Sequence, residues 1–270
     1  MKKVVLITGG SSGIGESTAI KMQENGWIVY AAARRLDRKE HLKAKGINII
    51  TLDVSVDESM VNCINHIKDA EGRIDALVNN AGYGSYGALE DVPLSEAKYQ
   101  FEVNVFGLGR LSQLVLPMMR AQNSGSIVNI SSIGGKTWEP HGAWYHATKF
   151  AVEGLSDCLR MEVKQFNINV VVIQPGAILT EWSAIARKKL LDTSGKTAYK
   201  GLVDKHVAML AKYDGQGSKP EVVANAITKA CNTNKPKTRY AVGSGAKMPL
   251  TLKSLLSDRW FDKFMFNLMK

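Results

Sequence analysis

The sequence is poor in cysteine and has no long apolar run. Only Cys63, Cys158 and Cys231 occur among 270 residues, and they show neither Cys-x-x-Cys nor metal-ligand spacing. An odd number of distant cysteines argues against a disulfide framework and a cysteine metal site. We expect Cys158, in a strongly helical stretch, to be a buried apolar side chain.

Signals for export or membrane insertion are also missing. No stretch approaches the roughly 18 apolar residues of a membrane-spanning helix. A strand-like run begins at Val4, where a secretory signal would need a longer apolar stretch and a small-residue cleavage site. We therefore expect a cytoplasmic protein. Repeats and low-complexity tracts are absent as well, which favours one compact domain over residues 1–270.

The positive charge is unevenly distributed along the chain. Met1–Trp182 contains 18 Lys and Arg against 19 Asp and Glu, whereas Ser183–Lys270 contains 17 against 6, so the net charge of +10 comes from the last third. This surplus could attract an anionic substrate or an acidic membrane surface, or it could be a solvated surface without a partner. No motif accompanies it that indicates a nucleic-acid partner.

Short apolar, β-branched runs alternate with helix-like segments. Continuous apolar runs are typical of strands buried on both faces of a parallel sheet, and strand–helix alternation requires right-handed crossovers. The sequence predicts an α/β fold, a Rossmann-like doubly wound parallel sheet of about seven strands with helices on both faces. The predicted strands are Lys3–Ile7, Ile28–Ala33, Ile47–Leu52, Ala76–Asn79, Ser126–Ile130, Asn169–Ile173 and Arg239–Val242. The predicted helices are Ile14–Asn25, Val56–Ala70, Glu96–Arg120, Ala143–Phe166 and Glu221–Cys231.

Two segments near the carboxyl terminus depart from this alternation. Glu181–Tyr213 is lysine-rich and has no strand pattern, so it should form an excursion above the sheet. Leu250–Lys270 has the spacing of an amphipathic helix. We expect this tail to pack on its own domain or on a neighbouring subunit, although peripheral contact with a membrane stays open.

A glycine-rich turn follows the first predicted strand and opens the first predicted helix. It has the pattern T-G-x-x-x-G-x-G, not G-x-G-x-x-G. Glycines let the backbone approach a pyrophosphate, and the helix N-terminus supplies free N–H groups and a positive dipole end. The candidate phosphate-binding residues are Gly9, Ser11, Ser12, Gly13, Ile14 and Gly15.

The end of the second predicted strand indicates which dinucleotide the turn prefers. A site that prefers NAD(H) usually has an acid about 20 residues after the glycine turn, to bind the ribose hydroxyls. Here Arg34 and Arg35 stand in that region. A guanidinium can pair with a 2′-phosphate, so the sequence favours NADP(H), unless these are ordinary surface arginines.

A tyrosine, a lysine and a serine form the candidate catalytic group. Tyr145 and Lys149 are four residues apart and hence on one helix face, where the ammonium should lower the pKa of the phenol. Ser132 ends the fifth predicted strand, and the carboxyl ends of strands hold the chemistry of α/β folds. Ser131 is its rival. We expect His146 to be a satisfied or exposed histidine, and we expect no metal.

These motifs resemble the short-chain dehydrogenase/reductase family over nearly the whole chain. The matching positions are the glycine turn, Asp53 and Val54, the Asn-Asn-Ala-Gly motif at Asn79–Gly82, Asn104, Ser132, Tyr145, Lys149, Pro175, Gly176 and Thr180. The segment from Tyr30 to Arg35 and the basic, aromatic tail are similar to the branch of 17β-hydroxysteroid dehydrogenases, retinol dehydrogenases and acyl-dihydroxyacetone-phosphate reductases.

The resemblance implies a role for each catalytic position. Tyr145 would be the general acid in reduction and the base in oxidation. Lys149 would lower its pKa and hold the nicotinamide ribose. Ser132 would orient the carbonyl, and Asn104 would fix a water that links Lys149 to solvent.

The resemblance also implies cofactor contacts and an assembly. Asp53 and Val54 would contact the adenine, and Thr180 would hold the carboxamide. Asn80 and Gly82, with Ala81 between them, would flank the adenosine ribose. Pro175 and Gly176 complete the cofactor set. The family commonly pairs the two long helices between subunits, which implies a homodimer or homotetramer.

The expected function is therefore that of an NADP(H)-dependent oxidoreductase that moves a hydride between nicotinamide and a carbonyl or secondary alcohol. Five aromatic residues should lie around the mouth of the site and favour a lipophilic substrate, or else pack the 181–213 segment against the core. They are Tyr83, Tyr86, Trp138, Trp144 and Trp182. An NAD-dependent alcohol dehydrogenase and a non-catalytic NADP(H)-binding regulator are the alternatives.

Overall fold

Seven parallel strands form one sheet in the computed structural model, which describes residues 1–34, 40–212 and 215–269. The strand order is β3-β2-β1-β4-β5-β6-β7, as predicted for a doubly wound sheet. The strands are β1 (Val4–Thr8), β2 (Ile28–Ala33), β3 (Asn48–Thr51), β4 (Ala76–Asn79), β5 (Gly125–Ile130), β6 (Ile168–Pro175) and β7 (Arg239–Val242). Each predicted strand is present, with ends that differ by at most two residues.

The strand order reverses at β1. This strand pairs in parallel with β2 on one side and with β4 on the other. Because the crossovers then leave in opposite directions, folds of this kind have their ligand crevice beyond the carboxyl ends of the two strands at the reversal, here β1 and β4. The glycine turn and the Asn-Asn-Ala-Gly motif follow these two strands, so the fold brings both motifs to this crevice.

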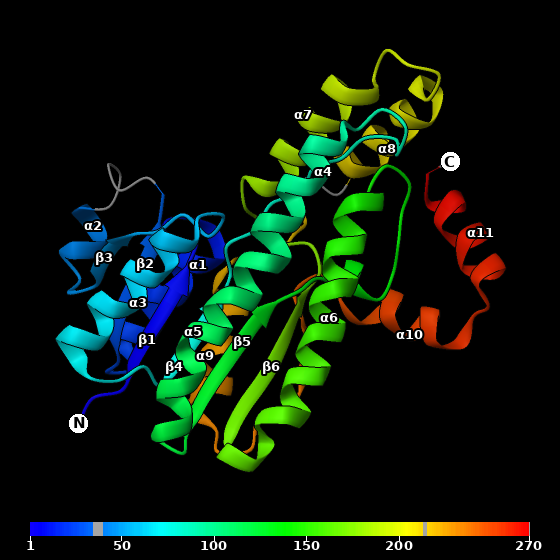
Figure 1. The fold of residues 1–270 in the computed structure, drawn as a ribbon. Helices are drawn as coiled ribbons and strands as arrows, with labels where there is room; N and C mark the ends of the chain where they lie inside the picture. Colours follow the sequence, from blue (N-terminus) through cyan, green and yellow to red (C-terminus); the bar gives the residue numbers. More distant parts are fainter. Residues whose placement is uncertain (35–39, 213–214, 270) are drawn as a thin grey trace.

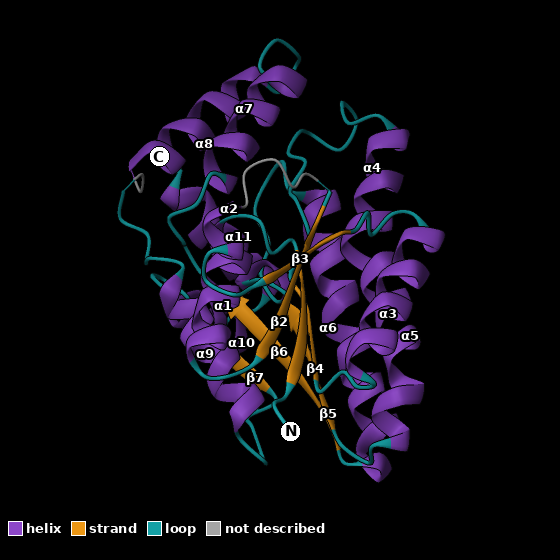
Figure 2. Cartoon of the chain, turned by 90° about the vertical axis from the view of Figure 1, so that its left-hand side faces the viewer, coloured by secondary structure: helices purple, strands orange, loops and turns teal. Residues whose placement is uncertain are grey.

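Helices cover both faces of the sheet, which Figure 2 shows in a view close to edge-on. On one face, α1 (Gly13–Glu24) and α9 (Glu221–Asn232) bury apolar residues such as Met22 and Ile227. On the other, α3 (Asp57–Glu71), α5 (Gly107–Ala121) and α6 (Ala143–Val163) do the same, for example with Leu111 and Val163. The central strands, β1, β2, β4, β5 and β6, are therefore buried on both faces, as their continuous apolar runs require, whereas the edge strands β3 and β7 are partly exposed.

The helix predicted over Glu96–Arg120 is more complex than its sequence pattern. It consists of α4 (Leu94–Phe101), a π-helix η1 (Glu102–Phe106) and α5 in one continuous rod. A π-helical turn inserts an extra residue and turns the side chains that follow, and such turns are frequent at functional sites. Asn104 lies within this turn.

The segment after β6 stands above the carboxyl edge of the sheet, as predicted. It folds into α7 (Trp182–Ser194) and α8 (Lys200–Lys212), which lie at the top of Figure 1.

The carboxyl-terminal tail forms two helices rather than one. They are α10 (Lys247–Leu255) and α11 (Asp258–Leu268), and Leu256 between them has an extended backbone. Phe261 of α11 is fully buried, and its ring centroid lies 5.1 Å from that of Trp138. The tail thus packs on its own chain. None of the helices in the described ranges has the length and apolar composition needed to cross a membrane.

One expectation about the cysteines is wrong. Cys63 and Cys231 are buried, but Cys158 is exposed. Helix α6 turns Val152, Ser156 and Leu159 toward the core, and Cys158 lies outside that stripe. Cys158 is helical, as predicted, but it lies on the face of α6 that points away from the core.

Candidate active site

The glycine turn between β1 and α1 is shaped by contacts that exclude side chains. Gly9 and Gly13 have φ angles of +62° and +53°, in the region that favours glycine. A Cβ on Gly15 would overlap the carbonyl oxygen of Gly9, and one on Gly10 would lie 2.9 Å from Cα of Ala31 in β2. The turn is therefore a backbone cradle at the N-terminus of α1, which fits a pyrophosphate. Ser12 precedes the helix as its N-cap, and Ile14 packs on the core beneath it.

Hydrogen bonds fasten the Asn-Asn-Ala-Gly motif to this turn. The hydroxyl oxygen of Thr8 accepts from the backbone N–H groups of Asn80 at 3.0 Å and Ala81 at 2.9 Å. The Asn80 amide donates to the carbonyl oxygen of Thr8 at 3.0 Å. Thr8 was not among the predicted site residues, although it begins the motif. Through these hydrogen bonds Thr8 connects the glycine turn to the Asn-Asn-Ala-Gly motif.

Charged groups lie at the end of β2 and β3. Arg34 donates through Nη1 to the hydroxyl of Tyr99 at 2.9 Å and is exposed. Burial alone would raise the pKa of Asp53, but hydrogen bonds from Ser55 and the charge of Arg34 hold it below its ordinary value. Asp53 is therefore anionic, and the positive charge of Arg34 contributes to its lowered pKa. Val54 is buried beside it, and Arg35 lies outside the described residues.

The structure brings Ser132, Tyr145 and Lys149 together at the carboxyl edge of the sheet. Ser132 follows β5, and a hydrogen bond joins its side chain to that of Tyr145 near the start of α6. Lys149, one turn later on α6, has its Nζ 5.9 Å from the centre of the Tyr145 ring. Ser131 is buried, and its hydroxyl reaches only the neighbouring Ser132 carbonyl oxygen, at 3.5 Å. Of the two candidate serines, Ser132 is the one in contact with the phenol.

Asn104 and Lys149 both lie close to Gly82. The Oδ1 of Asn104 accepts from the N–H of Tyr83 at 3.0 Å, while its Nδ2 donates to the Tyr83 carbonyl oxygen and to the hydroxyl of Thr148. A Cβ on Gly82 would lie 3.1 Å from Oδ1 of Asn104 and 3.8 Å from Nζ of Lys149. Both polar groups thus face the same glycine.

Burial dominates the electrostatics of the pair on α6. It raises the pKa of Tyr145 to about 12, although the hydrogen bond with Ser132 acts in the opposite direction. It lowers the pKa of Lys149 to about 8, against the opposing charge of Glu153. We expected the ammonium to lower the pKa of the phenol. In this structure desolvation of the buried phenol outweighs any such effect.

The loop after β6 returns to the glycine turn. Pro175 is the last residue of β6, and the N–H of Gly176 donates to the carbonyl oxygen of Val242 at 2.9 Å. A Cβ on Gly13 would lie 3.1 Å from Cγ2 of Thr180. Thr180 therefore closes over the turn from above, two residues before α7 begins at Trp182.

The five aromatic residues expected around the mouth divide into two sets. The rings of Tyr86 and Trp182 lie 5.7 and 5.3 Å from the Tyr145 ring, between centroids. The other three pack elsewhere: Trp138 against Phe261, Trp144 against Phe101, and Tyr83 against Tyr99. Two of the five thus line the site, and the rest contribute to packing.

Two carboxylates near the site were not predicted. Glu153 is buried, lies one helical turn after Lys149, and accepts from Nε of Arg239 at 2.9 Å. The spacing of four residues from Lys149 was a usable signal. Glu139 accepts from the hydroxyl of Tyr86 at 2.9 Å. Nothing in the sequence marks Glu139, because its partners come from distant segments.

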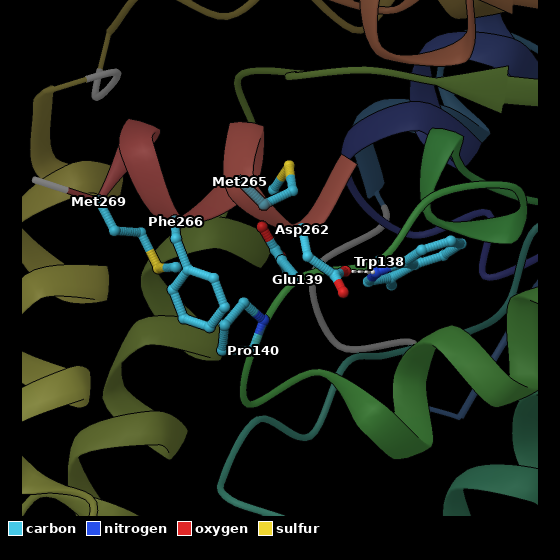
Figure 3. A pocket seen from close by; sticks show the side chains of 7 residues that line it. All are labelled: Trp138, Glu139, Pro140, Asp262, Met265, Phe266 and Met269. Carbon is cyan, nitrogen blue, oxygen red and sulfur yellow. Dashed lines mark hydrogen bonds between the residues drawn. The ribbon is translucent and has the colours of Figure 1, made fainter. Parts of the chain in front are cut away.

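The loop of Glu139 also has an outer face. Figure 3 shows a pocket in which Trp138, Glu139 and Pro140 face Met265 and Phe266 of α11. Trp138 donates from Nε1 to Asp262 at 2.8 Å. Helix α11 thus packs against the outer face of the loop that carries Glu139.

Comparison with known proteins agrees with this geometry. Residues 3–190 match the family model for short chain dehydrogenases. The chain is 35% identical over 242 residues to the 3-ketodihydrosphingosine reductase of Bacteroides thetaiotaomicron, covering 89% of this chain and 88% of the relative.

Solved structures give the same result. A short-chain dehydrogenase from Streptomyces avermitilis superposes with a TM-score of 0.81 at 35% identity, covering 94% of this chain and 93% of the other. Actinorhodin polyketide ketoreductase with NADPH superposes with a TM-score of 0.76 at 26% identity, covering 88% and 94%. The chain belongs to the short-chain dehydrogenase family, whose members are oxidoreductases that use a nicotinamide cofactor on small-molecule substrates.

Proposed function

We propose that this protein is an NADP(H)-dependent carbonyl reductase that transfers a hydride between nicotinamide and a lipophilic carbonyl or secondary alcohol. The observation that carries the proposal is the meeting of Ser132, Tyr145 and Lys149 beside the glycine turn. We propose further that the whole chain, residues 1–270, forms a single cofactor-binding domain around its one sheet.

The catalytic roles follow from the chemistry of these groups. The bound cofactor supplies or accepts the hydride. Ser132 donates a hydrogen bond to the substrate oxygen, and Tyr145 delivers the proton to it. Lys149 stabilises the phenolate that remains, and Asn104 holds a water on the path that returns a proton. A Tyr145 pKa of about 12 keeps the phenol protonated at neutral pH, the form that reduction requires.

The residues around the crevice fit a dinucleotide phosphate. The cradle at Gly9–Gly15 takes the pyrophosphate, with Ser11 and Ser12 as further donors. Arg34 and Arg35 pair with the 2′-phosphate. Asp53 and Val54 contact the adenine. The remaining cofactor contacts are Asn80, Ala81, Gly82, Pro175, Gly176 and Thr180. The NADPH bound by the similar actinorhodin ketoreductase supports this choice of cofactor.

The surroundings of Tyr145 support a lipophilic substrate. Tyr86 and Trp182 form an apolar wall beside the phenol. Leu179, in the loop that leads to Trp182, and Ile185, one turn into α7, are exposed. Exposed large apolar side chains on the segment that carries Trp182 are typical of a surface that meets a hydrophobic ligand. A relative named 3-ketodihydrosphingosine reductase also acts on a lipid, according to its name.

We propose a homodimer or homotetramer that pairs the rod of α4, η1 and α5 and helix α6 between copies. Phe106, Phe150 and Met161 are exposed on these helices, with relative exposures of 57%, 42% and 77%. Large apolar residues of this exposure on a helical face favour burial against a second copy. Light scattering coupled to gel filtration tests the proposal, and a monomer at micromolar concentration contradicts it.

The function is tested by NADPH consumption over a panel of ketones, aldehydes, steroids and retinoids. We expect turnover with lipophilic carbonyls and a loss of at least about 100-fold in kcat for Tyr145→Phe, the size of a general acid's contribution. NADPH binding by Tyr145→Phe should stay within about threefold, because the ring remains. Cofactor binding without turnover on any substrate would instead support a non-catalytic regulator.

A further inference from the structure

His146 directly follows Tyr145 in the sequence, and both of its ring nitrogens are bonded to backbone. Nδ1 lies 2.9 Å from the carbonyl oxygen of Gly134, and Nε2 lies 3.2 Å from the backbone nitrogen of Glu139. The side chain is buried, with a relative exposure of 8%. It therefore joins the two ends of the segment 134–139, which lies between β5 and α6.

These partners fix the protonation state of the ring. A carbonyl oxygen can only accept, so Nδ1 must carry a hydrogen and donate to Gly134. A backbone N–H can only donate, so Nε2 must keep its lone pair and accept from Glu139. Only the neutral imidazole with its hydrogen on Nδ1 satisfies both. A doubly protonated ring would set two N–H groups against each other at Nε2.

Two glycines enclose the ring. A Cβ on Gly134 would lie 2.9 Å from Nδ1, and a Cβ on Gly142 would lie 2.7 Å from Cδ2. A side chain at either position would collide with the imidazole, so both positions need glycine while the ring keeps this place. The segment 134–139 and the start of α6 therefore pack closely on the two sides of the imidazole.

The backbone of Gly134, which His146 contacts, also contacts the proposed catalytic serine. The N–H of Gly134 donates to Oγ of Ser132 at 3.0 Å, while His146 donates to the carbonyl oxygen of the same residue. The Gly134 backbone is thus held on both sides. With one lone pair of Oγ occupied by Gly134, the Ser132 hydroxyl is oriented relative to Tyr145.

At the other end of the segment, Glu139 contacts Tyr86, one of the two aromatic residues beside Tyr145. The Glu139 side chain accepts from the hydroxyl of Tyr86, whose ring lies against Tyr145. Figure 3 shows Glu139 between Trp138 and Pro140, in the loop that faces α11. The imidazole thus fixes the backbone of a residue that orients the wall of the substrate site.

We propose that His146 is a positioning residue: its neutral imidazole holds the Ser132 hydroxyl and the Glu139–Tyr86 pair in place relative to Tyr145. It does not touch substrate or cofactor and transfers no proton. The inference rests on the proposed function, because Ser132 and Tyr145 are catalytic only if the protein reduces carbonyls. In that reaction, His146 keeps the proposed catalytic groups aligned without reacting itself.

The test is a double-mutant cycle with Ser132. His146→Ala should lower kcat about 10- to 100-fold in the wild-type background, the range of a misplaced catalytic group. In a Ser132→Ala background the same change should cost markedly less, because the Ser132 hydroxyl is gone and only the Glu139–Tyr86 pair remains to be displaced. The dissociation constant of NADPH, from fluorescence titration, should stay within about twofold.

His146→Gln is the conservative variant. Its amide has a donor and an acceptor, so it can bond both Gly134 and Glu139 and should recover most of the kcat lost in His146→Ala. Equal losses in both serine backgrounds, or no recovery with glutamine, would overturn the inference. If His146→Ala fails to fold, the cycle is run with His146→Gln and His146→Asn, whose shorter amide reaches only one of the two partners.

A measurement independent of activity separates this inference from the proposed function. Long-range proton–nitrogen NMR correlation of His146 in the whole protein should show a neutral ring with its hydrogen on Nδ1. A charged ring, or a hydrogen on Nε2, overturns the inference even in an active enzyme. A wild-type protein that reduces no carbonyl contradicts the proposed function and, with it, the catalytic purpose assigned to His146.

Discussion

Lys149 donates a hydrogen bond from Nζ to the backbone carbonyl oxygen of Ile130 at 2.8 Å. The bond ties helix α6, which carries Tyr145, to the end of β5, which Ser132 follows. It also holds the amine in a buried place, where desolvation lowers its pKa to about 8. A lysine that titrates in this range makes the reaction sensitive to pH near neutrality.

Reduction should therefore slow as the pH rises through about 8. Below that pH, Lys149 is an ammonium and stabilises the phenolate left by proton transfer. Above it, this charge is lost. We expect kcat for reduction to fall between about pH 7.5 and 9.5, measured as initial NADPH consumption at saturating substrate.

Lys149→Arg is the matched variant for this limb. A guanidinium stays protonated to above pH 12, so the fall between pH 7.5 and 9.5 should disappear, although the absolute rate will be lower because the geometry differs. An alkaline limb that is unchanged in Lys149→Arg would assign the titration to another group.

Arg34→Asp should change the choice of cofactor. The substitution removes a guanidinium and adds a carboxylate that repels a 2′-phosphate, so NADPH should bind at least about tenfold more weakly while NADH binds no worse. Isothermal titration with both cofactors measures this. Tyr99→Phe is the control, because it removes only the hydroxyl that Arg34 contacts. A preference for NADH in the unaltered protein would favour the alternative of an NAD-dependent alcohol dehydrogenase.

Gly15→Ala should disrupt the cradle of the glycine turn. The added methyl group would overlap the carbonyl oxygen of Gly9 and lie 2.6 Å from Nδ2 of Asn80. We expect weaker NADPH binding by at least about tenfold and a lower Tm, since overpacking against backbone costs about 1–3 kcal/mol. Gly201→Ala on α8, away from the proposed subunit interface, is the control: nothing lies within 4 Å of its added Cβ. That variant should be neutral or stabilised by up to about 1 kcal/mol. Equal Tm values for both variants would contradict the argument.

His141 should make the folded state sensitive to acid. It is buried, and its Nδ1 lies 3.0 Å from Nδ1 of His206. Burial, with the charge of His206, lowers the pKa of His141 from 6.5 to about 4, against the opposing charges of Glu139 and Asp91. The unfolded chain therefore takes up a proton on His141 before the folded chain does. Stability is lost as the pH falls from about 6.5 to 4, by at most about 3 kcal/mol.

His141→Asn tests this dependence. Asparagine tolerates the φ of +66° at this position and does not titrate there. Urea unfolding at pH 7 and pH 4.5 should show a smaller loss of stability in this variant than in the wild type. Equal losses in both proteins would show that other groups cause the acid sensitivity.

The sequence predicted the sheet well because its strands carry their own signal. β2, β4 and β7 begin and end at the predicted residues, since each is a short apolar run set between polar or glycine-containing segments. The carboxyl-terminal tail was predicted less accurately, as one helix instead of two. Its apolar residues fit one amphipathic helix, yet the chain turns at Leu256 so that Phe261 can reach Trp138. Such a break follows from a contact between distant residues, which local periodicity does not contain.

The candidate site divides in the same way. Tyr145 and Lys149 were proposed from their separation of four residues. Ser132 was proposed from its place after a strand, and the family resemblance favoured it over Ser131. The hydrogen-bond partners were not. Nothing local indicates that Glu139 accepts from Tyr86, or that His146 bonds both Gly134 and Glu139. These partners meet because parallel strands bring their following loops to one edge.

By itself, the sequence determined the order of strands and helices and the glycine turn after β1, and it named the side chains that we propose to be reactive. These depend on residue type and on spacing along the chain. Only the tertiary structure decided the protonation of these groups and what holds them in place. Burial, which raises the pKa of Tyr145 and lowers that of Lys149, is a property of the assembled fold, because it depends on how much water the surrounding elements exclude.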